Sequence, residues 1–242
     1  MVKNTSVKRL EAVHLDEMSR LRLAVWWLRR TVRDVIGRDV LDVQDGAKKG
    51  GLAVHRIYKR ADEFVSRYLP GLKASTPKRV AMAQVRDAIE ELEYTVVDQD
   101  ENKPWGAYYR FASNQAERFI AEFFPGKSLA DMQLGHSDVE LSPKILLVAP
   151  GQRLSWQFHN RRAEIWRFLS KGAYHKSLTD EPGERHTAKV GYIIQFRQNE
   201  RHRLCTFDDT SYTLVAEIWQ HTDPTQLSDE ADIIRLQDDY QR

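Results

Sequence analysis

Apolar positions recur with helical spacing through the first third of the chain. From Val7 to Ile36 they fall three or four residues apart, as on one face of an amphipathic helix. A second helix is expected from Leu52 to Tyr68. A third begins at Thr76 as N-cap, with Pro77 in its first turn, and runs to about Glu93. The pattern predicts a helical extension over residues 1–95, whose expected role is assembly or dimerisation.

After Tyr94 the pattern changes to short segments rich in β-branched and aromatic residues, separated by turn residues. One short amphipathic helix, from Asn114 to Gly126, precedes them. Short antiparallel strands at this spacing indicate a sandwich or a closed barrel. We therefore expect a mainly β domain over residues 96–242. The expected strands are Lys144–Ala149, Arg153–His159, Ala163–Ser170, Ala173–Leu178, Lys189–Phe196, His202–Phe207 and Thr213–His221.

The segment from Pro150 to Phe168 carries the most informative polar residues. Side chains alternate along a strand, so Gln157 and His159 share one face, and a hairpin can bring Glu164 beside them. His202 is the best candidate for a fourth ligand. Imidazole, carboxylate and amide groups suit a divalent ion such as zinc, iron or manganese. The other histidines are assigned to ordinary core or surface positions: His14, His55, His136, His175, His186 and His221.

Three segments resemble a known family. KPWGAYYRF (103–111), SPKILLVAPGQRLSWQFHNRRAEIW (142–166) and DEADIIRLQDDYQR (229–242) are similar to blocks of the C-terminal part of type II phosphomannose isomerases, in the same order. The resemblance spans about 140 residues and leaves out residues 1–95. It implies a cupin-type double-stranded β-helix, a jelly-roll barrel. It also implies one divalent metal ion, zinc by preference, bound by Gln157, His159, Glu164 and His202.

The sequence departs from the family pattern at several positions, among them the family's histidine-rich turn, which is here His159-Asn160-Arg161. Ile165 follows Glu164 where the family has histidine, and Arg197 stands where it has proline. Asn199 replaces a turn glycine, which asparagine tolerates because it can adopt a left-handed backbone. Gln241 interrupts the final Tyr-Gly-Arg. These differences leave the expected metal ligands intact and bear on the identity of the substrate.

The resemblance implies an intramolecular oxidoreductase that interconverts mannose 6-phosphate and fructose 6-phosphate through a cis-enediol. Arg162 shares a face with Glu164 and is expected to hold the phosphate or stabilise the enediolate. Lys144, Arg235 and Arg203 are weaker candidates for the phosphate or for proton transfer, and Glu217 is the candidate base. Two alternatives stay open: a non-catalytic, metal-dependent sugar-binding or regulatory cupin, and an isomerase or epimerase of another sugar.

Charge is distributed unevenly along the chain. Residues 1–90 hold 19 Lys and Arg against 11 Asp and Glu, and residues 91–242 hold 18 against 24. Attraction between the two parts, or between two chains of a homodimer, explains this better than a nucleic-acid partner, although a DNA-binding regulator remains an alternative. With a single cysteine, Cys205, no apolar run of membrane-spanning length and no visible secretory signal, we expect a cytoplasmic protein.

Overall fold

A computed structural model describes residues 72–137 and 139–242. The helices expected at Val7–Ile36 and Leu52–Tyr68 lie outside the described residues, as do His14 and His55. Among the described residues, no helix is long and apolar enough to cross a bilayer. The helices are α3 (Lys78–Glu91), α4 (Ala116–Phe123) and α5 (Leu129–Met132), with a 3₁₀ turn, η1 (Ser113–Gln115), before α4.

Helix α3 starts differently from the expectation. Its N-cap is Pro77, which offers no side-chain hydrogen bond, so the prediction that Thr76 caps the helix is wrong. The Thr76 hydroxyl instead accepts a hydrogen bond from the backbone N–H of Lys73. The buried face of α3 packs into the same core as the six-stranded sheet. The predicted boundary at residue 95 therefore separates elements that share a core, and it stays a prediction.

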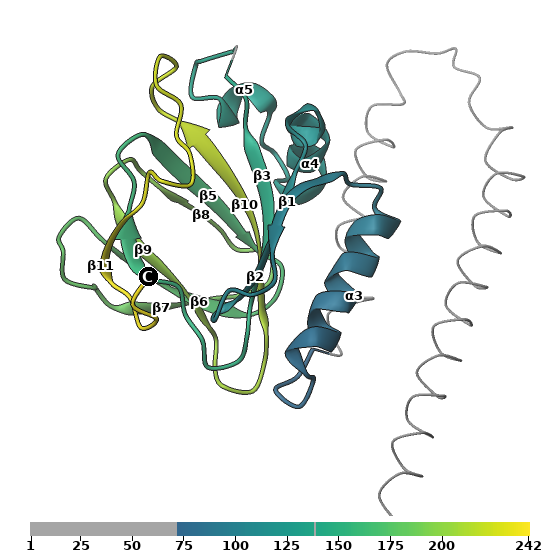
Figure 1. The fold of residues 1–242 in the computed structure, drawn as a ribbon. Coiled ribbons are helices and arrows are strands. Elements are labelled where there is room, and N and C mark those ends of the chain that lie inside the picture. Colours follow the sequence, from purple (N-terminus) through teal and green to yellow (C-terminus); the bar gives the residue numbers. More distant parts are fainter. Residues whose placement is uncertain (1–71, 138) are drawn as a thin grey trace, which may run out of the picture. The chain divides into compact units, whose positions relative to one another are not determined.

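The strands form two antiparallel sheets (Figure 1). The six-stranded sheet has the order β1-β2-β3-β10-β5-β8, and the five-stranded sheet has the order β11-β4-β9-β6-β7. The strands are β1 (Val96–Asp100), β2 (Gly106–Phe111), β3 (Ser142–Val148), β4 (Trp156–Phe158), β5 (Arg162–Phe168), β6 (Gly172–Ser177), β7 (Arg185–Ala188), β8 (Ile193–Phe196), β9 (Arg201–Thr206), β10 (Thr213–His221) and β11 (Ile234–Gln237).

The pairing of β3 to β10 defines the architecture. The first of these eight strands pairs with the last, β3 with β10, and the pairing continues inward through β4 with β9, β5 with β8, and β6 with β7. This is one long hairpin rolled up so that its successive pairs alternate between two sheets. It is the eight-stranded jelly roll, the double-stranded β-helix that the sequence predicts.

The two faces of the six-stranded sheet bury different sets of residues. The outer face carries Ile145, Leu147 and Ile165, which pack with α3 and α4 in one apolar core. Leu146, Val148 and Trp166 belong to a second core between the sheets, with residues of β6, β8 and β9. Successive residues thus divide between the faces, as strand geometry requires. The barrel interior is therefore lined by the alternate set that includes Lys144, Glu164 and Glu217.

Gly106, the first residue of β2, allows β2 to approach β3. Its φ is +157°, and a Cβ atom there would lie 1.7 Å from the carbonyl oxygen of Leu147. Any side chain at this position would push β2 away from β3. The glycine thus brings the Tyr108 side of β2 against the strand that carries Lys144.

Candidate metal centre

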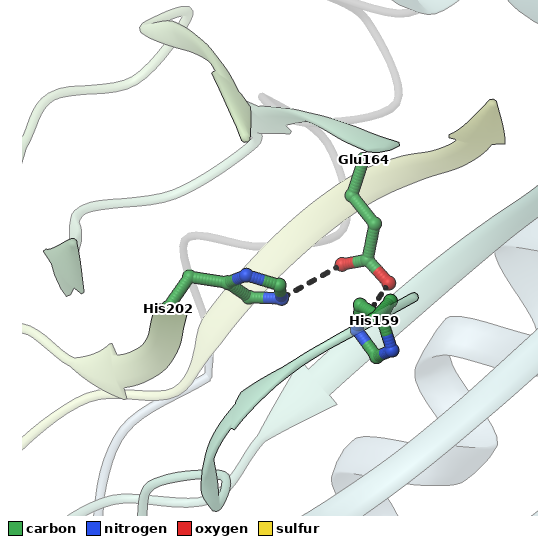
Figure 2. Close-up of side chains that lie close together, drawn as sticks. All are labelled: His159, Glu164 and His202. Carbon is green, nitrogen blue, oxygen red and sulfur yellow. Dashed lines mark ion pairs between the residues drawn. The ribbon is translucent and has the colours of Figure 1, made fainter. Parts of the chain in front are cut away.

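Three of the four predicted ligands meet inside the barrel (Figure 2). His159 follows β4, Glu164 lies on β5 and His202 lies on β9. The Nε2 atom of His159 is 3.0 Å from Oε1 of Glu164, and the Nε2 atom of His202 is 3.2 Å from Oε2 of the same carboxylate. All three side chains are buried, and their ligand atoms lie within 4.8 Å of one another. This group could hold a metal ion.

Backbone carbonyl groups orient both imidazole rings. The Nδ1 atom of His159 lies 2.6 Å from the carbonyl oxygen of Asp232, and that of His202 lies 2.9 Å from the carbonyl oxygen of Glu200. In each case Nδ1–H is the donor, so the lone pair of Nε2 is directed toward Glu164. Metal-binding histidines in proteins are commonly held in this way.

The contact between His202 and Glu164 tests whether a cation fits. Neither Nε2 of His202 nor Oε2 of Glu164 has a hydrogen-bond partner among the described residues, although both are buried. With Nδ1–H donating to Glu200, both atoms are acceptors and face each other at 3.2 Å. Such a pair needs a proton or a cation between its members. A divalent ion satisfies both atoms, so the residues present fit a metal.

The surroundings keep the ligands in the ionisation states that bind metals. Burial alone would raise the pKa of Glu164, but the facing imidazoles of His159 and His202 outweigh it and hold this pKa well below its usual range. Burial lowers the pKa of His159. A carboxylate and a neutral imidazole are the forms that coordinate a metal ion.

Gln157 lies next to this group. It is the direct cross-strand neighbour of His202 and is mostly buried. Its side-chain oxygen accepts a hydrogen bond of 2.6 Å from the Ser155 hydroxyl. Its predicted role as a fourth ligand stays a prediction.

Arg162 contacts the ligands directly. Its Nε donates to Oε1 of Glu164 at 3.0 Å, and one Nη lies 3.4 Å from Nε2 of His159. The other Nη donates to the Ser228 hydroxyl at 2.8 Å and to the carbonyl oxygens of Asp229 and Asp232. Most of its donors are therefore used inside the protein. Arg162 links the metal ligands to the segment after β10.

Lys144 and Glu217 are side by side on β3 and β10. Burial and the charge of Glu164 raise the pKa of Glu217 to about 8, and the indole N–H of Trp166 donates to its Oε2 at 2.9 Å. Lys144 is buried, which lowers its pKa, and its ammonium group forms an ion pair of 2.8 Å with Glu230. The structure thus brings two of the predicted catalytic residues together.

The two remaining arginine candidates lie on different faces. Arg235 is exposed on β11 and pairs with Gln157 in the strand register, so these two side chains share a face. Arg203 follows His202 on β9, so its side chain lies on the other face of that sheet. One Nη of Arg203 donates to the backbone oxygen of Gln237 at 3.3 Å. Arg203 therefore does not line the barrel interior with the ligands.

Sequence reasoning missed the contribution of Asp232. Its carboxylate accepts hydrogen bonds from the backbone N–H groups of Asn160 and Arg161, which form the turn between β4 and β5, and from the Ser228 hydroxyl. Its backbone oxygen orients His159. Asp232 lies in the C-terminal block that carries the family resemblance, and this was the only signal in the sequence.

A double-stranded β-helix with a buried His-Glu-His group inside it defines the class of this protein: it has a cupin fold with a candidate metal site. No protein-family profile matches the sequence, and no curated protein matches it either. The fold class therefore rests on the strand pairing.

Solved structures similar to this chain are distant. A cupin 2 conserved barrel domain protein from Salinispora arenicola is 19% identical, with a TM-score of 0.29 over 35% of this chain and 65% of its own. A putative sugar phosphate isomerase from Acidithiobacillus ferrooxidans is 20% identical, with a TM-score of 0.30 over 40% of this chain and 58% of its own. An oxalate decarboxylase variant from Bacillus subtilis is 14% identical, with a TM-score of 0.37 over 60% of this chain and 30% of its own. The chain spans less than two thirds of each.

Proposed function

We propose that this protein is a metal-dependent aldose–ketose isomerase of a phosphorylated sugar, of the mannose 6-phosphate and fructose 6-phosphate type. The observation that carries the proposal is the arrangement at one end of the barrel interior. There the His-Glu-His group, Glu217 and Lys144 all lie on inward faces of neighbouring strands. Such a reaction needs a Lewis acid, a proton acceptor and a cation for the phosphate.

His159, Glu164 and His202 would hold the metal ion, with Gln157 as the additional ligand. Bound there, a divalent ion polarises the sugar carbonyl group and favours the enediolate. We propose zinc, because imidazole and carboxylate ligands suit it, with iron and manganese as alternatives. The fit of His202 and Glu164 to a cation supports a metal without selecting among these three.

Glu217 is the proposed base. The reaction moves one proton between C1 and C2, so the same group must take the proton up and give it back. A carboxyl group with a pKa of about 8 serves both steps near neutral pH, because either form is readily populated. The indole of Trp166 holds this carboxyl group by a hydrogen bond. Arg162, with its donors engaged by Glu164 and Ser228, is proposed to position the ligands.

An interconversion assay of mannose 6-phosphate and fructose 6-phosphate tests the proposal, with other phosphosugars and free pentoses included. We expect about one metal ion per chain by elemental analysis. The Glu217→Gln variant should lose at least about 100-fold in kcat and keep its metal content, because general acid–base catalysis contributes that much. If the metal-loaded protein interconverts no sugar, the proposal is wrong.

The main alternative is a non-catalytic, metal-dependent sugar-binding or regulatory cupin. The observation that favours it is that Arg162 and Lys144 both already have acidic partners. The same assay separates the two functions, because a binding module would retain sugar affinity without turnover. Turnover of a different sugar would indicate another isomerase or epimerase. We further propose a cytoplasmic homodimer, whose mass can be measured by light scattering.

A further inference from the structure

One end of the barrel interior, called the polar end below, holds the His-Glu-His group, Lys144 and Glu217. The segment between β10 and β11 contacts this end at two neighbouring positions. The backbone oxygen of Asp232 accepts the hydrogen bond that orients His159. Two residues earlier, Glu230 accepts a hydrogen bond of 2.8 Å from the ammonium group of Lys144. One short segment therefore contacts both a candidate metal ligand and the buried lysine.

The ion pair between Lys144 and Glu230 is asymmetric. The Lys144 side chain is 4% exposed, whereas the Glu230 side chain is 60% exposed. The ammonium group also lies 3.2 Å from the centroid of the Trp219 ring and 5.4 Å from that of Tyr108. Lys144 is thus fixed inside the barrel, and the carboxylate reaches it from solvent.

The two partners differ in what they lose when they separate. Glu230 is mostly hydrated already, and an exposed carboxylate contributes little to an ion pair. Lys144 is desolvated, so an ammonium group without a counterion there is costly. Lys144 consequently requires an anion, but that anion need not come from Glu230.

We propose that Lys144 is the binding point for the anionic group of the ligand, and that the Glu230 carboxylate occupies this point until the ligand replaces it. The phosphate as the anion rests on the proposed function. In the exchange no covalent bond changes: Glu230 moves into solvent, and the phosphate oxygens take its place beside the ammonium group.

Asp229 provides a matched control. It precedes Glu230, its side chain is 61% exposed, and it pairs with Arg161 at 3.1 Å and not with Lys144. Replacement of either acid by its amide removes one negative charge from the same segment. Of the two replacements, only the one at Glu230 removes a carboxylate that accepts a hydrogen bond from Lys144.

The experiment is a calorimetric titration of inorganic phosphate into the full-length, metal-loaded protein at fixed ionic strength. Glu230→Gln should bind phosphate about fivefold more tightly than the wild type, which corresponds to the contribution of an exposed ion pair. Asp229→Asn should stay within about twofold, because its charge is hydrated and screened. Lys144→Met should weaken phosphate binding by at least about tenfold, since a hydrogen bond to a charged group is lost.

Two results would overturn the inference. One is an unchanged phosphate affinity in Glu230→Gln, and the other is an equal increase in Asp229→Asn, which would reveal a general effect of charge. Glu230 and Asp229 are both exposed, so their two variants test the inference even if Lys144→Met fails to fold. The isomerase proposal fails separately: a normal response to phosphate without sugar turnover would leave Lys144 as the anion site of a non-catalytic cupin.

Discussion

At one end of the barrel interior, β3, β5 and β10 contribute Leu146, Phe168 and Val215, which pack in an apolar core. The same face of these strands also carries three polar residues, each two to four positions from its apolar neighbour: Lys144, Glu164 and Glu217. Both ends are equally buried. The difference shows that one continuous set of strands supports both a packed core and a polar site.

The two ends are stabilised differently. The apolar end gains free energy from burial and close packing. At the polar end, buried charges cost free energy unless each is paired. Arg162 with Glu164, Lys144 with Glu230, and the histidines with backbone oxygens meet this requirement in part. The contact between His202 and Glu164 needs a bound cation between the two facing acceptors. The free energy of unfolding should therefore depend on metal at this end.

The largest expected effect is at the apolar end. Phe168 is fully buried, and replacement by alanine leaves a cavity that should lower the free energy of unfolding by about 4 kcal/mol. Denaturation in urea measures this change. Leu178→Ala is the control, because Leu178 is 76% exposed and its loss should change stability by less than about 0.5 kcal/mol. Equal effects in the two variants would contradict the assignment of this end as a packed core.

A smaller effect, conditional on metal, is expected at the polar end. Metal at 100 times its dissociation constant should raise the free energy of unfolding by about 2.7 kcal/mol, because it binds the folded state alone. The double variant His159→Ala with His202→Ala should show no such increase. Phe168→Ala should keep it, since that side chain lies in the apolar core. A double variant that still responds to metal would show that the ligands are assigned wrongly.

Alternation along strands made much of this arrangement predictable. The strand expected at Thr213–His221 has those bounds in the structure. Asn199, which was expected to tolerate a left-handed backbone, has a φ of +61°. The meeting of His159, Glu164 and His202 was also predicted. The hairpin spacing indicated His159 and Glu164, His202 was the best candidate outside the hairpin, and the family resemblance indicated all three.

Other features depend on contacts that no local pattern contains. The strand expected at Lys189–Phe196 is in fact β8, which begins only at Ile193. A turn that includes Gly191, with a φ of +83°, separates it from β7. Glu230 meets Lys144 across 86 positions of the sequence, and Asp232 meets His159 across 73. Such partners are set by the rolled topology, so the sequence around Glu230 and Asp232 gave no local sign of them.

The smallest expected effect concerns Asp232, which joins the polar end to the segment that covers it. Burial alone would raise the pKa of its carboxyl group, but hydrogen bonds from Ser228, Asn160 and Arg161 lower it below its usual range. A group whose pKa is lowered by folding stabilises the protein above its unfolded pKa, and this stability is lost as the pH falls. The contribution should therefore be complete at pH 7 and decline below about pH 4.

Asp232→Asn should lower the free energy of unfolding by about 1 kcal/mol at pH 7, since the amide cannot accept all of these hydrogen bonds. Urea denaturation at pH 7 and near pH 3 measures the difference, which should shrink at the lower pH because the wild-type carboxylate is then partly protonated. Asp239→Asn, which removes an exposed pair with Arg153, should have less effect at either pH. A difference between Asp232→Asn and the wild type that does not change with pH would mean that packing, and not the charge of Asp232, holds the turn beside His159.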